Sequence, residues 1–326
     1  MKNIILILLI STLSVPIFSQ DTSTKSNLKD SVMENKSSFN EDDLFYLLNN
    51  EDEKEEVLVS AIFKGTKIIN LQSVELTNEQ ELQFIISHRF GTINSGIMDL
   101  YGLDYGSIRM SFDYGIKDWL NIGVARSSYG KIIDGSIKYE LLHQGKILNL
   151  GKLTSSPVSI VGYSAIYIDP VDWRDPNRLN FSTSRLSYVN QLHIARKFNK
   201  NLSIQLSPTL LHYNMVPKIG DNNDLFALGI GTRYKINGSI SINLEWIPIL
   251  SSGVDIIHPL KNKNFINSFS LGCDIETGGH VFQLMLTNSI GMYDESFVGG
   301  NTGTWKNGDI HFGFNITRPF SFKNSH

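Results

Sequence analysis

The feature that most constrains this chain is a two-residue alternation of apolar and polar side chains that recurs along most of the 326-residue sequence. Successive side chains of a β-strand point to opposite faces, so each alternating stretch predicts a strand with one apolar face. A tilted strand that crosses a membrane needs about 9–11 residues. About twelve stretches approach that length: 81–90, 107–116, 119–127, 133–142, 158–168, 185–198, 202–213, 225–236, 239–246, 268–276, 280–288 and 309–317.

The first stretch, ELQFIISHRF, places two neighbouring ionisable residues, His88 and Arg89, on opposite faces. Apolar residues such as Leu82 and Phe84 share the face of His88, whereas Arg89 falls among polar side chains. We therefore interpret the two residues as the upper end of a strand rather than as a catalytic dyad. Arg89 is expected to point into the interior, and His88 toward lipid near the outer rim.

Alternation alone fits a soluble β-sandwich, whose apolar face points inward, and a transmembrane barrel, whose apolar face points outward. Three observations favour the barrel. The polar face is rich in Gly, Ser and Asn with isolated charges, and short connections alternate with long ones. Aromatic residues also recur near strand ends, as membrane interfaces require: Tyr114, Trp119, Tyr139, Tyr213, Tyr234, Trp246 and Phe320. We predict an all-β transmembrane antiparallel up-and-down β-barrel of about 12 strands over residues 80–320, with a soluble sandwich as the alternative.

The N-terminal residues predict export. Residues 1–20 carry Lys2, an apolar run at 4–13 and a small-polar end, which is typical of a cleaved secretory signal peptide. Residues 21–56 hold eleven acidic residues and four lysines, which indicates a mostly disordered periplasmic leader. The leader is either a plain linker or a docking segment for a periplasmic partner. Residues 321–326 are a short tail, and Cys273 is the only cysteine, so no intramolecular disulfide can form.

Residues 57–79, between the leader and the first strand, have strand character but would break the even strand count. Three readings stay open: a linker, an extra strand, or a plug that folds into the barrel and brings Lys64 and Lys67 with it.

Several segments resemble the DUF5777 family, Bacteroidetes outer-membrane β-barrel proteins of unknown function. They are FKGTKIINLQSVE, ELQFIISHRFGTINSG, YGLDYGSIRMSFDYGI, NIGVARSSYGKIIDGSIKY and the ending GDIHFGFNITRPF. The resemblance covers residues 63–320, is densest before Tyr139, and holds in order as well as wording. It implies an outer-membrane barrel and no assigned activity.

The charged residues on the polar face are the candidate functional set. An ionised side chain inside a narrow barrel must be paired or solvated. The set either fills the interior with ion pairs or lines a pore, and Arg89 and Arg109 are expected to face Asp113 or Glu140. Its members are Glu81, Arg89, Arg109, Asp113, Lys138, Glu140, Arg233, Lys235, Glu245, Asp274 and Glu276.

Catalysis and cofactor binding have little support. None of the eight histidines is followed by serine at the second position, the spacing of a lipid hydrolase on an outer barrel wall. Histidine spacing offers no metal site, and we expect no cofactor and no nucleic-acid partner. The loops 169–183 and 291–309 have the composition of ordinary surface loops. We predict a non-enzymatic barrel, either a narrow channel for small solutes or ions or a structural or binding barrel, in contact with outer-membrane lipid. The alternatives are a lipid hydrolase and a loop-mediated adhesion or receptor barrel.

Overall fold

The computed structural model describes residues 61–149, 152–173, 179–216, 222–251, 257–258 and 263–322. The predicted signal peptide and acidic leader lie outside these residues, and of the predicted tail only residues 321 and 322 are described.

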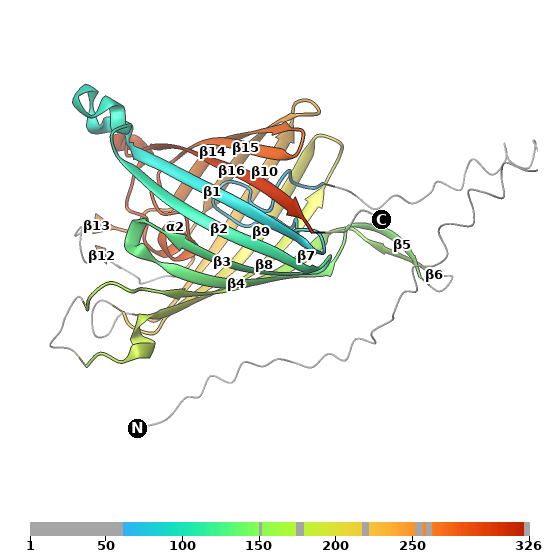
Figure 1. The fold of residues 1–326 in the computed structure, drawn as a ribbon, viewed down its shortest axis with the longest axis horizontal. Coiled ribbons are helices and arrows are strands. Elements are labelled where there is room, and N and C mark those ends of the chain that lie inside the picture. The colour runs from blue at the N-terminus through green and yellow to red at the C-terminus, as the bar shows by residue number, and fades with distance from the viewer. Residues whose placement is uncertain are drawn as a thin grey trace, which may run out of the picture. The chain divides into compact units, whose positions relative to one another are not determined.

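Within the described ranges, twelve antiparallel strands close into a barrel (Figure 1). Each wall strand pairs with the next wall strand along the chain, and β1 closes the barrel against β16, starting at Glu81↔Ser321. The predicted up-and-down barrel is therefore confirmed. The wall strands are β1 (Glu81–Thr92), β2 (Gly106–Lys117), β3 (Leu120–Ser127), β4 (Ile133–Leu142), β7 (Ser159–Ile168), β8 (Leu186–Lys197), β9 (Leu202–Tyr213), β10 (Asp224–Lys235), β11 (Ile240–Ile247), β14 (Ser268–Thr277), β15 (His280–Thr287) and β16 (His311–Ser321).

The two ends of the barrel differ in their connections. The end that holds the start of β1 and the end of β16 carries the short turns, and we call it the turn end. One connection there is long, because it contains the hairpin of β5 (Gly145–Asn149) and β6 (Lys152–Ser156). The opposite, loop end carries η2 (Ile93–Ser95), η3 (Ile97–Gly102), η4 (Tyr129–Lys131), η5 (Ser182–Arg185), β12 (Ile257–His258), β13 (Lys263–Asn264), α2 (Asp294–Gly299) and η6 (Trp305–Asn307). None of the helices in the described ranges is long and apolar enough to span a membrane.

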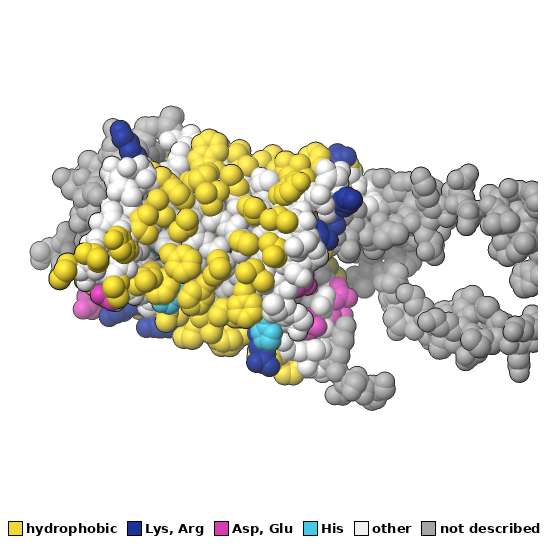
Figure 2. All heavy atoms as spheres, turned by 90° about the horizontal axis from the view of Figure 1, so that it is seen from above, with side chains coloured by type: hydrophobic (Ala, Val, Ile, Leu, Met, Phe, Trp, Pro, Cys, Tyr) yellow, Lys and Arg dark blue, Asp and Glu magenta, His cyan; other side chains and the backbone are white. Residues whose placement is uncertain are grey.

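The outward face of the wall is apolar. On β2, for example, Ile108, Met110 and Phe112 are 43–45% exposed, as expected for side chains that contact lipid rather than water. Figure 2 shows such side chains gathered over the wall, with charged side chains mainly toward its two ends. An apolar band of this kind is the surface that an outer-membrane-type barrel presents to lipid. His88 lies on this face, with its ring 5.2 Å from that of Phe314.

The inside of the barrel is filled by two pieces of the same chain. Residues 61–80, which we call the lumen segment, contact inward-facing side chains from many wall strands. The segment is not part of the closed sheet, so the extra-strand reading is wrong. At the loop end, α2 buries Phe297 and Val298 against wall residues. The expectation that 291–309 is an ordinary surface loop is therefore wrong as well, because these apolar side chains find a buried cluster.

Gly115 of β2 offers a test of how closely the lumen segment fits the wall. A Cβ at this position would overlap the carbonyl oxygen of Asn78 and lie 2.7 Å from that of Thr77. Overpacking of this kind costs about 1–3 kcal/mol, and backbone atoms cannot rotate away. We therefore expect Gly115→Ala to loosen the segment and to raise the rate of trypsin cleavage after Lys64 in the folded barrel.

The matched control is Gly135→Ala on β4, where a new Cβ meets nothing nearer than 3.8 Å. It should leave cleavage at the wild-type rate. Equal protection of the segment in both variants would contradict the close fit.

Candidate functional site

The lumen segment enters and leaves the barrel at the turn end and forms a hairpin between. Ile68 donates its N–H to the carbonyl of Leu71 at 2.9 Å, and Ser73 donates to that of Thr66 at 2.9 Å. Lys67 and Gln72 make an antiparallel bridge between the two arms. Residues 68–71 are thus a reverse turn that points into the lumen.

The tip of this turn is held by one carboxylate, that of Glu245 on β11. Its Oε2 accepts the backbone N–H groups of Ile69, Asn70 and Leu71 at 3.3, 3.0 and 2.9 Å. Glu245 is fully buried. Three converging N–H donors satisfy one oxygen of this buried carboxylate, whereas its Oε1 has no hydrogen-bond partner among the described residues. The carboxylate in turn satisfies three N–H groups that the turn itself leaves unpaired.

The carbonyl groups of the segment are met by side-chain donors of the wall. Gln283 donates to Ile68 O at 2.9 Å, Asn315 to Ile69 O at 3.1 Å, and Gln205 to Gln72 O at 2.7 Å. Cationic side chains bind the two arms nearer the turn end. Lys138 donates to the carbonyls of Thr66 and Glu75, and Arg233 to those of Ala61 and Ile62.

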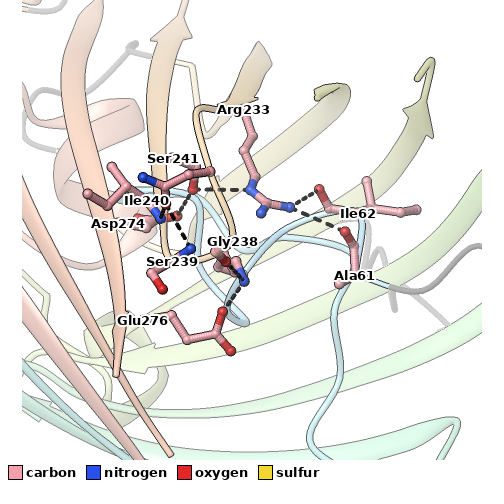
Figure 3. A network of polar contacts seen from close by, with 11 residues as sticks. Ala61, Ile62, Arg233, Gly238, Ser239, Ile240, Ser241, Asp274 and Glu276 are labelled. Atoms are coloured by element: carbon pink, nitrogen blue, oxygen red, sulfur yellow. Dashed lines mark hydrogen bonds and ion pairs between the residues drawn. The ribbon is translucent and has the colours of Figure 1, made fainter. Parts of the chain in front are cut away.

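Figure 3 shows the second of these cationic contacts from close by. The Arg233 guanidinium points at the carbonyls of Ala61 and Ile62, at 3.2 and 3.0 Å, and its Nε donates to Ser241 at 3.2 Å. Ser241 in turn donates to Asp274 at 3.3 Å. Five residues of the barrel and segment are thereby linked in one polar network at the turn end.

Glycines of the wall make room for the apolar side chains of the turn. A Cβ at Gly229 would lie 2.7 Å from Leu71, and one at Gly272 would lie 3.1 Å from Ile69. A Cβ at Gly231 would overlap Ile68. Three notches in the wall thus accept the aliphatic side chains of Ile68, Ile69 and Leu71, and a larger wall residue would exclude them.

At the loop end, α2 fills the lumen from the other side. Asp294 accepts hydrogen bonds from Tyr167 on β7 at 2.6 Å and from Gln191 on β8 at 2.8 Å. Phe297 of α2 and Leu71 of the lumen segment belong to the same buried hydrophobic cluster. The two fillings therefore share one core inside the barrel.

The structure gives Arg109 a different partner from the expected Asp113 or Glu140. Its two terminal nitrogens bind the two carboxylate oxygens of Asp134 at 2.5 and 2.7 Å, and both side chains are buried. Asp134 lies two strands away on β4, opposite Ala125 of β3. The long guanidinium crosses the small inward-facing side chains of β3 to reach it.

Arg89 also lacks the expected carboxylate partner. Its guanidinium donates to the side-chain oxygens of Asn70 at 3.0 Å and Asn315 at 3.3 Å, and to the carbonyl of His88 at 2.9 Å. It is 1% exposed. Arg89 thus binds the lumen segment through Asn70 and the neighbouring strand β16 through Asn315.

The other predicted charged residues differ in how far they are buried. Glu245, Lys138, Arg233 and Asp274 are buried, and three of them bind the lumen segment directly. The rest lie closer to the turn end. Asp113, Glu81, Glu140 and Lys235 are half-buried, and Glu276 is exposed and forms an ion pair with Lys64 of the segment.

Lys67 is the second lysine of the candidate plug, and it is 7% exposed. Burial, and after it the charge of Arg109, lower the pKa of its ammonium to about 8. The carboxylates of Asp294, Asp113 and Asp134 act in the opposite direction. The two predicted plug lysines therefore differ, since Lys64 lies at the turn end and Lys67 lies deep in the lumen.

Several residues that hold the segment escape a search for charges. They are the uncharged amides Gln205, Asn243, Gln283 and Asn315. The carboxylate Asp134, which binds Arg109, is also missing from the predicted charged set. All five occupy inward positions of their strands, so the alternation could have identified them. Asp294 follows no alternating pattern, and no sequence signal marks it.

Little open space is left between the segment and the wall. A cavity of about 10 Å³, enough for about one water molecule, is lined by Thr66, Asp113, Lys138 and Tyr163 among others. Over the described part of the chain, no group of three or more His, Cys, Asp or Glu residues is placed to hold a metal ion.

The docking of α2 should depend on pH through Asp294. Burial raises the pKa of this carboxyl above the ordinary 3.8, while Tyr167, Lys67 and Arg109 act to lower it and Asp134 to raise it. A carboxyl whose pKa is raised in the folded state contributes stability below its unfolded value, and the contribution is lost as the pH rises. We therefore expect α2 to undock more readily at pH 8 than at pH 4.

The measurement is the rate of chymotrypsin cleavage at Tyr293 and Phe297, divided by the rate for a free peptide of the same sequence at each pH. Asp294→Asn carries no titrating group and can still accept from Tyr167, so its normalised rate should not change with pH. A pH dependence of equal size in both proteins would exclude Asp294 as its source.

Comparison with known proteins is consistent with a barrel. A family model described as a membrane-bound β-barrel domain, DUF5777, matches residues 63–320. Among solved structures, the chain is similar to the NanC porin, with 9% identity, a TM-score of 0.44, and coverage of 74% of this chain and 99% of that one. It is similar to the KdgM porin, with 9% identity, a TM-score of 0.41 and coverage of 74% and 99%. It is also similar to an outer membrane channel from Pseudomonas putida F1, with 11% identity, a TM-score of 0.41, and coverage of 75% of this chain and 97% of that one. Among curated proteins, none matches the sequence.

Proposed function

Because this chain belongs to the DUF5777 family of membrane-bound β-barrel domains, we propose that it is a non-enzymatic barrel of the outer membrane that its own lumen segment closes at rest. Small solutes or ions pass only when the segment moves. The observation that carries the proposal is the seat of the segment's turn on Glu245, with three hydrogen bonds to one buried carboxylate.

A movable plug is favoured by the kind of contacts that the segment makes. It leaves the barrel at the turn end, so it can withdraw without breaking any strand pairing of the wall. Apart from backbone hydrogen bonds at the turn end, such as that from Gln80 to Gly115, its contacts with the wall are side-chain hydrogen bonds, two ion pairs and the apolar contacts at the glycine notches. Wall groups such as Gln283 and Asn315 would bind water instead once the segment had left.

The second candidate is a structural barrel that is permanently filled. The buried hydrophobic cluster shared by Leu71 and Phe297 favours it, because withdrawal of the segment would expose part of that cluster. A single buried aliphatic side chain contributes about 1.5–3 kcal/mol, so the cluster raises the free energy of opening without forbidding it.

The hydrolase alternative has one structural feature to consider. Ser207 and His193 are in hydrogen-bond contact at 2.9 Å, on neighbouring strands of the lumen wall. The imidazole nitrogen that faces Ser207 also contacts the amide of Gln205, rather than a carboxylate that would orient it for proton transfer. Both residues are fully buried beside the lumen segment, so the pair reads as part of the polar wall.

Single-channel conductance in planar bilayers tests the plug. We expect the full-length wild-type protein to be nearly silent. Glu245→Ala leaves three N–H groups of the turn unpaired, at about 1–3 kcal/mol each, and should raise the open fraction at least about tenfold. Since α2 also fills the loop end, the same change combined with Asp294→Ala should conduct more than either single variant.

Glu276→Ala is the matched control, because it removes a carboxylate that binds the same segment at an exposed position. An exposed ion pair contributes about 0–1 kcal/mol, so this variant should stay silent. Protease cleavage of the segment would show whether it has been released in the Glu245 variants. If it is released and these variants still do not conduct, the channel is refuted and the structural barrel is supported.

A further inference from the structure

The wall of the lumen recognises the backbone of the segment more than its side chains. The carboxylate of Glu245 accepts three backbone N–H groups. Amide side chains donate to four carbonyl oxygens of the segment. Gln283 binds those of Lys67 and Ile68, Asn315 binds that of Ile69, and Gln205 binds that of Gln72. These donors and acceptors are present in every peptide, whatever its sequence.

The arms of the hairpin are held in the same way. Lys138 donates to the carbonyl oxygens of Thr66 and Glu75, one from each arm. Arg233 donates to two further carbonyls, at the point where the segment enters the barrel. Among the described contacts, ion pairs between a segment side chain and the wall occur only near the turn end, between Lys64 and Glu276 and between Glu79 and Lys117.

Side-chain contacts are densest at the tip of the turn, and in the arms Thr66 donates its hydroxyl to Gln83 of β1 at 2.6 Å. The notches at Gly229, Gly231 and Gly272 accept aliphatic groups. Asn70, between them, is bound by Arg89 at 3.0 Å and donates to Ser270 at 3.0 Å. The lumen thus combines backbone recognition along its length with a demand for a turn of aliphatic residues around one small polar residue.

We propose that the lumen is a peptide-binding site, that the lumen segment is its resident ligand, and that short peptides with an aliphatic turn are the solutes that it admits when the segment leaves. The proposal rests on the proposed function in one respect, since the segment must be able to leave. A covalent tether gives the resident segment an effective concentration of about the millimolar range, so a free peptide competes only after the tether is cut.

The test uses the folded, full-length barrel with a protease site inserted after Asn78, an exposed residue near the end of the segment and shortly before β1. Cleavage converts the segment into a ligand held only by non-covalent contacts, and folding is already complete. Washing should then open the channel, and a labelled synthetic peptide of residues 61–78 should bind saturably and close it again. The conductance on washing reports the proposed function, and peptide binding reports this inference.

Peptide variants separate backbone from side-chain recognition. Alanine at the positions of Lys64, Lys67, Gln72 and Ser73 keeps every backbone contact, so affinity should fall by no more than about threefold. Alanine at the position of Asn70 removes only its side chain, whereas proline there also removes the N–H that Glu245 accepts at 3.0 Å. The proline peptide should therefore bind at least about tenfold more weakly than the Asn70→Ala peptide. Glu245→Ala in the barrel should weaken the unmodified peptide by a similar factor.

A barrel that opens on washing but binds no peptide would overturn the peptide site and leave the channel standing. Binding that the four alanines abolish and the proline leaves unchanged would also overturn it, because the wall would then read one sequence. A barrel that retains the cut segment through washing and stays silent would contradict the proposed function itself. An uncharged oligosaccharide of similar mass is the control solute, and it should not compete with the labelled peptide.

Discussion

The arrangement inside this barrel depends on the carboxylate of Glu245, which the fold buries completely in the lumen. A buried carboxylate is destabilising unless hydrogen-bond donors surround it. The turn at residues 68–71 supplies three N–H groups to it, and those groups have no partner within the turn. One carboxylate oxygen therefore binds all three N–H groups of the turn, and the position of the turn then determines where the two arms and the glycine notches must lie.

The barrel wall follows from the sequence because a period of two residues fixes both the strand and its faces. The positions of Arg89 inside and His88 outside follow from the same rule. Partners were harder to predict, because strand phase says nothing about register. Arg109 binds Asp134 across β3, and Arg89 binds Asn70 of a segment whose place in the fold no periodicity indicates.

The sequence did contain a sign that the lumen is filled. Val161, Leu211 and Met285 are buried at inward positions of their strands, where a wet channel would favour polar residues. They pack with the lumen segment and α2. Apolar residues at inward positions of an otherwise polar face therefore indicated that something apolar fills the lumen. The helix within 291–309 left no such sign, because the composition of this segment matches that of an exposed loop. Only the folded structure shows that Phe297 packs in a buried cluster.

Whether the lumen segment lies inside the membrane-embedded barrel can be measured directly by cysteine cross-linking. Ile69 and Gly272 are suitable, since a Cβ at Gly272 would lie 3.1 Å from Cγ1 of Ile69, and Cys273→Ser removes the native thiol. In that background, Ile69→Cys with Gly272→Cys should form a disulfide in intact membranes, whereas Ile69→Cys with Gly135→Cys should not. Absence of the disulfide, together with free labelling of the position-69 thiol by a membrane-impermeant reagent, would contradict the account.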